Sequence, residues 1–212
     1  MRILLLLMLC SIFSVTAFSQ SSSQAPVNAD SAKINKQQAE KARMARLISG
    51  MTYPVVHGTD RSGVIDVKDY TEKTDTNMVY KLLFDWTVFN PDSLVGESNA
   101  GLNEIAHKIN LHVGAGIPLR NLRLVVIIHG PALKAITNND YYRERYKIDN
   151  PNIKMLNEMT AAGVKFIACG QAMANQGVER KMLLPMIGVA FTAQTSFSYY
   201  QMMGYIKFDD KR

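Results

Sequence analysis

Apolar runs of two kinds alternate along the second half of the chain. Five short runs are rich in apolar and β-branched residues, as in strands, at 79–86, 122–129, 164–169, 187–193 and 205–208, and the centre of the second, 124–128, is continuously apolar. Between them lie segments with helical spacing or helix boundary signals, at 98–113, 151–162, 170–176 and 194–203. Alternation of this kind implies right-handed crossovers, and continuously apolar strands imply a sheet covered on both faces. We therefore expect an α/β fold, a three-layer sandwich around a mainly parallel sheet of about five strands.

One helix has distinct signals at both ends. Asn150 is expected to cap it, Pro151 to occupy its first position, and Gly163 to follow its last turn. The segment between them carries apolar residues on a single face. These signals predict a helix over 151–162.

The first residues have the pattern of a secretory signal peptide. Arg2 precedes an apolar run over 3–13, and a short polar stretch then leads to Ser19. The run is too short to cross a bilayer, which takes roughly 20 helical residues. Cys10 lies inside the run behind a bulky leucine, which argues against a lipidated cysteine. We expect cleavage near Ser19, export to the periplasm or beyond, and no stable membrane insertion.

The segment that follows is expected to pack little. Residues 20–29 are rich in Ser and Gln and predict a disordered linker. From Asp30 or Ser31 to Gly50 the composition favours an exposed helix. We thus predict four parts: a signal peptide (1–19), a linker with an exposed helix (20–50), an irregular segment or small hairpin (51–77) and the α/β domain (78–212).

Charge and motifs exclude several classes of function. The formal net charge is +6, but the basic residues are scattered among acids, whereas nucleic-acid binding favours a clustered basic face. The chain has no Walker loop, dinucleotide fingerprint, nucleophile elbow or zinc-binding motif. His107 and His112 are five residues apart, so a helix turns them onto different faces. We expect no nucleic-acid partner, no metal and no cofactor.

One cysteine remains after the signal peptide. The sequence has two cysteines, and removing Cys10 leaves Cys169 without an internal disulfide partner. An unpaired cysteine in an exported protein is buried and inert, bonded to another chain, or functional. Cys169 ends a predicted strand and directly precedes a predicted helix, where the helix dipole favours a thiolate. A small buried apolar residue is the alternative interpretation of this position.

A second candidate lies at the end of the neighbouring strand. Ligands collect beyond the carboxyl ends of parallel strands. The first predicted strand ends near Asp85, and the second ends at His129 and Gly130. His129 is suited to proton transfer near neutral pH, although a lone histidine is more often a structural residue.

The segment Gly163-Val164-Lys165-Phe166-Ile167-Ala168-Cys169-Gly170-Gln171-Ala172 resembles the cysteine-bearing core of the DsrE/DsrF-like sulfur-relay family. Residues 125–132 look like that family's strand and glycine turn, and 201–206 look like its closing helix and strand. The resemblance covers about 79–208. It implies a YchN-like α/β fold, assembly into homo- or hetero-oligomers, and a cysteine that carries sulfur as a persulfide. Cys169 falls on the family's cysteine position.

Three functions remain open. In the first, Cys169 is a sulfur carrier or exchanging thiol, the Gly170 and Gln171 amides stabilise its thiolate, and His129 and Gly130 line the pocket. Its partners would be a protein sulfur donor or acceptor. In the second, the protein is a non-catalytic oligomeric module that binds a small ligand or a protein at the same strand ends. In the third, Cys169 and His129 act as a hydrolase or transferase pair.

Overall fold

The computed structural model describes residues 27–209, with side chains from residue 31 onward. The expected signal peptide and its cleavage point near Ser19 lie outside the described residues. Contacts divide the chain into two compact units between Arg43 and Met44. Helix α1 (Val27–Ser49) ends just before Gly50, as predicted. It begins inside the segment expected to be a linker, because no residue after Pro26 interrupts a helix.

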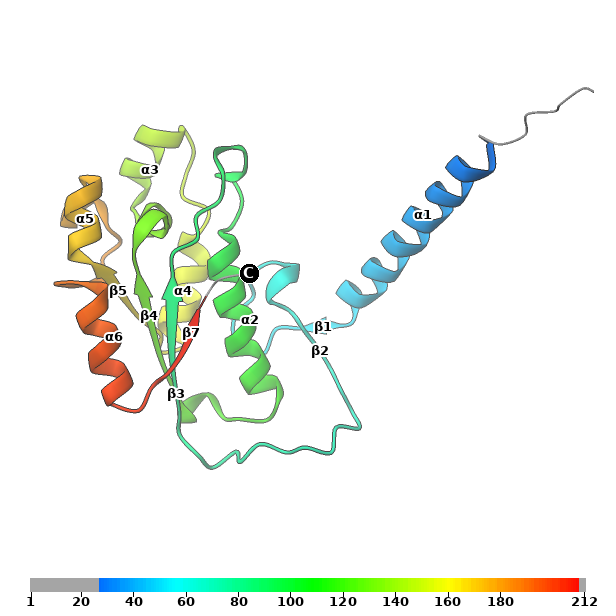
Figure 1. Ribbon diagram of the computed structural model, residues 1–212, viewed down its shortest axis with the longest axis horizontal. Helices are drawn as coiled ribbons and strands as arrows, with labels where there is room; N and C mark the ends of the chain where they lie inside the picture. Colours follow the sequence, from blue (N-terminus) through cyan, green and yellow to red (C-terminus); the bar gives the residue numbers. More distant parts are fainter. Residues whose placement is uncertain (1–26, 210–212) are drawn as a thin grey trace, which may run out of the picture. The chain divides into compact units, whose positions relative to one another are not determined.

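A parallel sheet of five strands forms the centre of the second unit (Figure 1). Its spatial order is β6-β5-β4-β3-β7, and every neighbouring pair is parallel. The strands are β3 (Tyr80–Trp86), β4 (Leu122–Ile128), β5 (Lys165–Cys169), β6 (Gly188–Ala190) and β7 (Ile206–Asp209). The predicted α/β class with its parallel sheet is confirmed. β6 is shorter than expected because the Thr192 hydroxyl accepts the amide of Gln194 and starts a helix there.

Helices cover both faces of the sheet. On one face, α2 (Ala100–Gly114) and α4 (Ile153–Ala161) pack in the larger apolar cluster with side chains such as Phe84 and Val126. On the other face lies α6 (Ala193–Met202) (Figure 1). It covers a smaller cluster that contains Ile127 and Cys169. Two helical layers around one sheet make the expected three-layer sandwich.

Helix α4 begins two residues later than predicted. Asn152, rather than Asn150, occupies the position before its first residue. The side-chain amide of Asn150 instead donates to the carbonyls of Ala135 and Thr137, at 2.9 and 2.7 Å. Its oxygen accepts the amide of Asn152 at 2.9 Å. Buried carbonyls without a strand partner need a donor, and Asn150 supplies it.

Two helical segments between β4 and α4 were not predicted. They are the 3-10 helix η4 (Gly130–Ile136) and helix α3 (Asn139–Tyr146). The sequence of α3 is charged and has no apolar stripe, so periodicity does not reveal it. Its buried Tyr142 donates a hydrogen bond to the Val95 carbonyl at 2.7 Å, and burial raises the pKa of this phenol to about 12.

The irregular segment before the sheet is fastened to α2. It contains the predicted small hairpin, β1 (Met51–Thr52) with β2 (Val64–Ile65). The buried Asn110 side chain accepts the amides of Val55 and Val56 at 3.0 Å each. It also donates to the carbonyls of Val56 and Ser62 at 2.9 Å each. One asparagine thus satisfies four backbone groups of a segment that has little regular structure.

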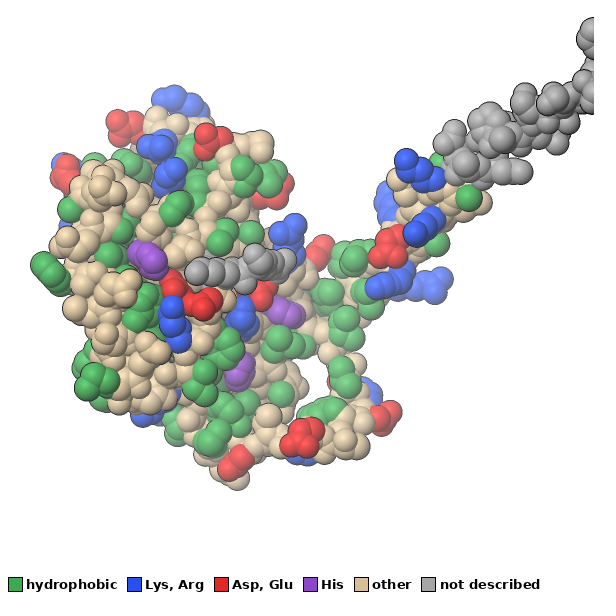
Figure 2. Space-filling view, in the orientation of Figure 1, with side chains coloured by type: hydrophobic (Ala, Val, Ile, Leu, Met, Phe, Trp, Pro, Cys, Tyr) green, Lys and Arg blue, Asp and Glu red, His purple; other side chains and the backbone are tan. Residues whose placement is uncertain are grey.

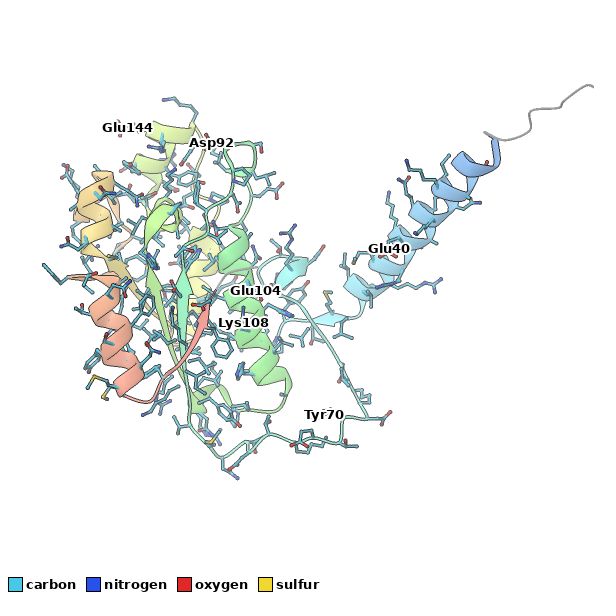
Figure 3. All side chains as sticks on the ribbon, in the orientation of Figure 1. Glu40, Tyr70, Asp92, Glu104, Lys108 and Glu144 are labelled. Carbon is cyan, nitrogen blue, oxygen red and sulfur yellow. The ribbon has the colours of Figure 1, made fainter. Side chains whose placement is uncertain are left out.

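The surface is mixed in charge. Figure 2 shows acidic and basic side chains interspersed over the visible face. A typical pair is Glu104 with Lys108, 2.7 Å apart on successive turns of α2 (Figure 3). Among the described residues, no helix combines the length and apolar character that crossing a membrane requires.

A close contact at the start of α2 yields a stability prediction. A Cβ on Gly101 would lie 2.7 Å from Nε1 of the fully buried Trp86, whereas one on Gly114, in the same helix, meets nothing closer than 3.4 Å. We expect Gly101→Ala to lower the free energy of unfolding by about 1–3 kcal/mol through overpacking. Gly114→Ala should be neutral or stabilising by about 0.5 kcal/mol, because alanine favours helix.

Urea unfolding followed by circular dichroism measures the free energy of unfolding of both variants. Equal stability of the two alanine variants would contradict this account of the Trp86 contact.

Candidate functional site

The candidate residues from three strands meet at the carboxyl edge of the sheet, on the face covered by α6. Cys169 ends β5, His129 follows β4, and Asp85 is near the end of β3. Ile128 pairs with Ala168, so the parallel register places His129 beside Cys169 one position further on. The sheet therefore brings together the two residues that the sequence singled out, with Asp85 next in the row.

Two helix amino termini converge on the Cys169 sulfur. The amide of Ala172, in α5 (Gly170–Gln176), lies 3.5 Å from Sγ, and the amide of Ala193, which begins α6, lies 3.2 Å away. The Thr192 hydroxyl is 4.0 Å from Sγ. Amides in the first turn of a helix have no hydrogen-bond partner within that helix, and they form the positive end of the helix dipole. Two backbone N–H donors from different helices are thus aimed at one sulfur atom.

The amides differ from those expected from the sequence. Cys169 is the cap residue of α5, and a cap side chain accepts from the second or third amide of its helix, here that of Ala172. The Gln171 amide donates to the Phe191 carbonyl at 3.2 Å instead. The second donor, Ala193, lies 24 residues away in sequence, and no local motif indicates it.

Gly170 contributes space rather than a hydrogen bond to sulfur. A Cβ at this position would lie 2.8 Å from the Ala190 carbonyl and 3.2 Å from the Phe191 carbonyl. Only a glycine lets the end of β6 approach the start of α5 this closely. That approach brings the Ala193 amide to the sulfur.

Gly130 connects the histidine strand to α5. Its φ of +57° lies in the left-handed region that favours glycine. Its carbonyl accepts a hydrogen bond from the side chain of Gln176, the last residue of α5, at 2.9 Å. The glycine turn after His129 is thus tied to the helix that begins beside Cys169.

His129 is held by a carboxylate. Its Nε2 lies 2.8 Å from Oδ1 of Asp85, and its ring meets Phe197 of α6 edge-on at 6.0 Å. Lys207 on β7 forms ion pairs with Asp85 and Asp209, both at 2.8 Å, and its ammonium lies 4.5 Å from the Phe197 ring centre. No motif in the sequence marks Lys207 or Asp209. The alternation Lys207-Phe208-Asp209 on the last strand, which puts both charges on one face, was the available signal.

The charges in this group support one another. Burial raises the pKa of Asp85, but hydrogen bonds and attraction from His129 and Lys207 outweigh burial, so the net shift is downward. Burial lowers the pKa of Lys207, but its hydrogen bonds with Asp209 and Asp85 raise it overall. Asp85 therefore stays ionised and orients the imidazole of His129.

The cysteine itself is a buried free thiol. Cys169 is 5% exposed and packs with Ile167 and Phe197. Within residues 27–209, no three His, Cys, Asp or Glu side chains are grouped to hold a metal ion. The arrangement is that of an α/β protein with a thiol at a strand-to-helix junction.

Comparisons with known proteins identify the family. The sequence model of the DsrE/DsrF-like family matches residues 91–208, a little more than half of the chain. The protein belongs to this family. No curated protein matches the chain. A solved structure of similar fold is MTH1491 from Methanobacterium thermoautotrophicum, described as a protein of unknown function. It is 19% identical, with a TM-score of 0.44, over 61% of this chain and 98% of its own.

The Asp85 carboxylate makes folding stability depend on pH. Its pKa in the folded state lies below the ordinary 3.8, so its contribution is present above that pH and is lost as the pH falls through the lowered folded value. Asp85→Asn should lower the free energy of unfolding near neutral pH by about 1–3 kcal/mol. The gap to wild type should narrow as the pH falls below about 4, because the unfolded chain then takes up a proton that the folded carboxyl still resists, and it should close as the pH falls through the lowered folded value.

Chemical denaturation at a series of pH values measures this gap. Asp209→Asn is the matched control, because Asp209 pairs with the same lysine but is half exposed, and its effect should be smaller. A gap that stays constant down to about pH 2.5, well below the ordinary aspartate pKa of 3.8, would refute the role given to Asp85.

The spacing at Gly170 provides a second test of the site. Gly170→Ala should push residues 190–191 away from α5, lower the free energy of unfolding by about 1–3 kcal/mol and loosen the Ala193 contact to sulfur. Gly188→Ala on β6 is the matched control, since a Cβ there would have ordinary contact with the Phe166 carbonyl at 3.4 Å. Amide hydrogen exchange at Ala193 is the specific readout. It should accelerate in the Gly170 variant and not in the control.

Proposed function

We propose that this protein is a sulfur carrier or thiol-exchange protein in which Cys169 is the nucleophile. The observation that carries the proposal is the pair of backbone amides, from α5 and α6, that point at Sγ. Amides so placed favour negative charge on sulfur, and the thiolate is the reactive form in sulfur exchange. Membership of the DsrE/DsrF-like family supports the same proposal.

The proposed reaction needs no external oxidant. The Cys169 thiolate attacks the outer sulfur of a persulfide on a donor protein. A new sulfur–sulfur bond forms on Cys169 while the donor's sulfur–sulfur bond breaks, and the donor thiolate leaves with the electron pair. The outer sulfur keeps its oxidation state, and an acceptor thiolate later removes it by the same exchange.

His129 is the proposed proton carrier. Its Nε2 is engaged by Asp85, so Nδ1 is the nitrogen that can take the Cys169 proton or return one to a leaving thiolate. Asp85 fixes the ring by the contact already described, and Lys207 fixes Asp85. In this proposal His129 moves a proton to and from sulfur, and Asp85 holds its ring in place.

The setting of the reaction is part of the proposal. We propose export after cleavage near Ser19 and assembly into a homo-oligomer, with a protein as sulfur donor or acceptor. Large exposed apolar side chains at and around α6, among them Phe191 and Met202, are compatible with assembly. In an oxidising compartment an open persulfide is short-lived, and the burial of Cys169 limits its oxidation.

A second candidate function is a non-catalytic binding module. The 5% exposure of Cys169 and its packing in the apolar cluster under α6 favour this alternative. In such a module Cys169 packs, caps α5 and does not react. The two candidates differ in the chemistry of a single atom, Sγ.

Sulfur loading separates the two. On incubation with a low-molecular-weight persulfide, the carrier should gain the mass of one sulfur atom, and peptide mapping should place it on Cys169 rather than Cys10. Cys169→Ser should gain none at this peptide. His129→Gln should load more slowly near neutral pH and recover as the pH rises, because hydroxide then replaces the base.

Loading must also be reversible. The added sulfur should pass to an acceptor thiol, and the mass should return to that of the starting protein. The ordinary thiol pKa is about 8.5, so the test covers pH 6–9. Folded protein that takes up no sulfur at Cys169 across this range would refute the sulfur-carrier function and favour the binding module.

A further inference from the structure

We infer that a second site, at the amino-terminal end of the strands, binds a small organic anion that carries a flat ring. A cavity of about 770 Å³ lies there, lined by the first residues of β4 and β5 and by the ends of α4 and α6. The side chains that give it its character are Arg120, Arg123, Lys165, Tyr199, Tyr200 and Tyr205. The inference does not depend on the function proposed for Cys169.

The charge of the lining points to an anion. Its three charged side chains are all cations, and no Asp or Glu lines the cavity. Within the described part of the chain, none of the three forms an ion pair with a carboxylate. Arg123 donates to the backbone carbonyls of Arg120 and Leu122, at 2.7 and 3.1 Å, which positions its guanidinium without neutralising it. Three cations on one cavity with no carboxylate among its lining residues favour an anionic ligand.

The tyrosines form a ladder of rings on one side of the cavity. Tyr199 meets Tyr200 edge-on at 5.1 Å, and Tyr200 meets Tyr205 edge-on at the same distance. The Lys165 ammonium lies 5.8 Å from the Tyr200 ring centre, and its interaction with Tyr200 raises the pKa of this lysine. Burial raises the pKa of Tyr205, so this phenol remains a hydrogen-bond donor at neutral pH. Aromatic faces beside cations are suited to a ligand that is flat as well as anionic.

The size of the cavity excludes a bare inorganic anion as its full occupant. Pockets for organic ligands measure roughly 300–1,000 Å³. The remaining lining is apolar, with Leu119, Leu124 and Met203 among it, and suits a ring better than water. The ligand class is thus an aromatic carboxylate or an aromatic phosphate monoester.

The cavity is separate from the thiol site. Lys165 begins β5 and Cys169 ends it, so the two residues lie about 13 Å apart at roughly 3.3 Å per residue. The two ends of one strand therefore serve two sites.

Four probes test the inference by isothermal titration of the full chain. Adenosine monophosphate and 4-hydroxybenzoate combine a ring with an anion, whereas adenosine lacks the anion and inorganic phosphate lacks the ring. We expect at least one of the first two to bind at least about tenfold more tightly than both of the others. If the phosphate monoester binds and the carboxylate does not, the natural ligand is a phosphate ester, and the reverse result identifies a carboxylate. Equal or absent binding of all four would overturn the inference.

Variants locate the binding. Arg120→Gln and Lys165→Gln alter exposed side chains and should keep the fold, yet each should weaken binding of the ringed anion by about tenfold. Lys181→Gln is the matched control, because Lys181 is exposed and pairs with Glu179 away from the cavity. Tyr199→Leu should weaken the ringed anions more than inorganic phosphate. Binding that is unchanged in Arg120→Gln and Lys165→Gln would show that the ligand lies elsewhere and would overturn the assignment.

Discussion

The convergence of two helix amino termini on one sulfur atom is the constraint around which this protein is arranged. For the Ala193 amide to reach Cys169, the end of β6 must approach the start of α5 more closely than any side chain at position 170 would allow. Gly170 permits that approach, and Thr192 starts α6 at the point where it occurs. The parallel pairing of β5 with β6 aligns the two strand ends, so both helices begin at the same level above the sheet. A change in any of these features would move an amide away from the sulfur.

The row of polar residues beside the sulfur depends on the same sheet. Parallel strands in the order β5-β4-β3-β7 place Cys169, His129, Asp85 and Lys207 on one face near one edge. Ion pairs and hydrogen bonds within this row offset the cost of burying Asp85, and the ring of Phe197 lies against both His129 and Lys207. The cluster under α6 is therefore part core and part candidate site. Because Cys169 belongs to both, its sequence context is compatible with a buried apolar residue and with a reactive thiol.

The two ends of the sheet differ in chemistry. At the carboxyl ends, backbone amides, an imidazole and paired charges surround a thiol. At the amino ends, cations without acid partners and a ladder of tyrosines surround an open cavity. Helix α6 contributes to both, with the amide of Ala193 at its start and Tyr199 and Tyr200 near its end. A single helix thus contributes residues to both sites.

The sequence by itself determined the class of fold and the strand ends that carry the candidate site residues. Apolar runs and glycine boundaries are local signals, so they revealed five strands, most helices and the junction at Cys169. Local signals did not distinguish Asn150 from Asn152 as the residue before α4, because that choice depends on buried carbonyls supplied by a distant turn. Only the tertiary structure decided which amides face the sulfur and which charges hold His129. Apart from the local Ala172 amide, those partners come from residues 24 to 78 positions away, and strand order and register, rather than spacing along the chain, bring them together.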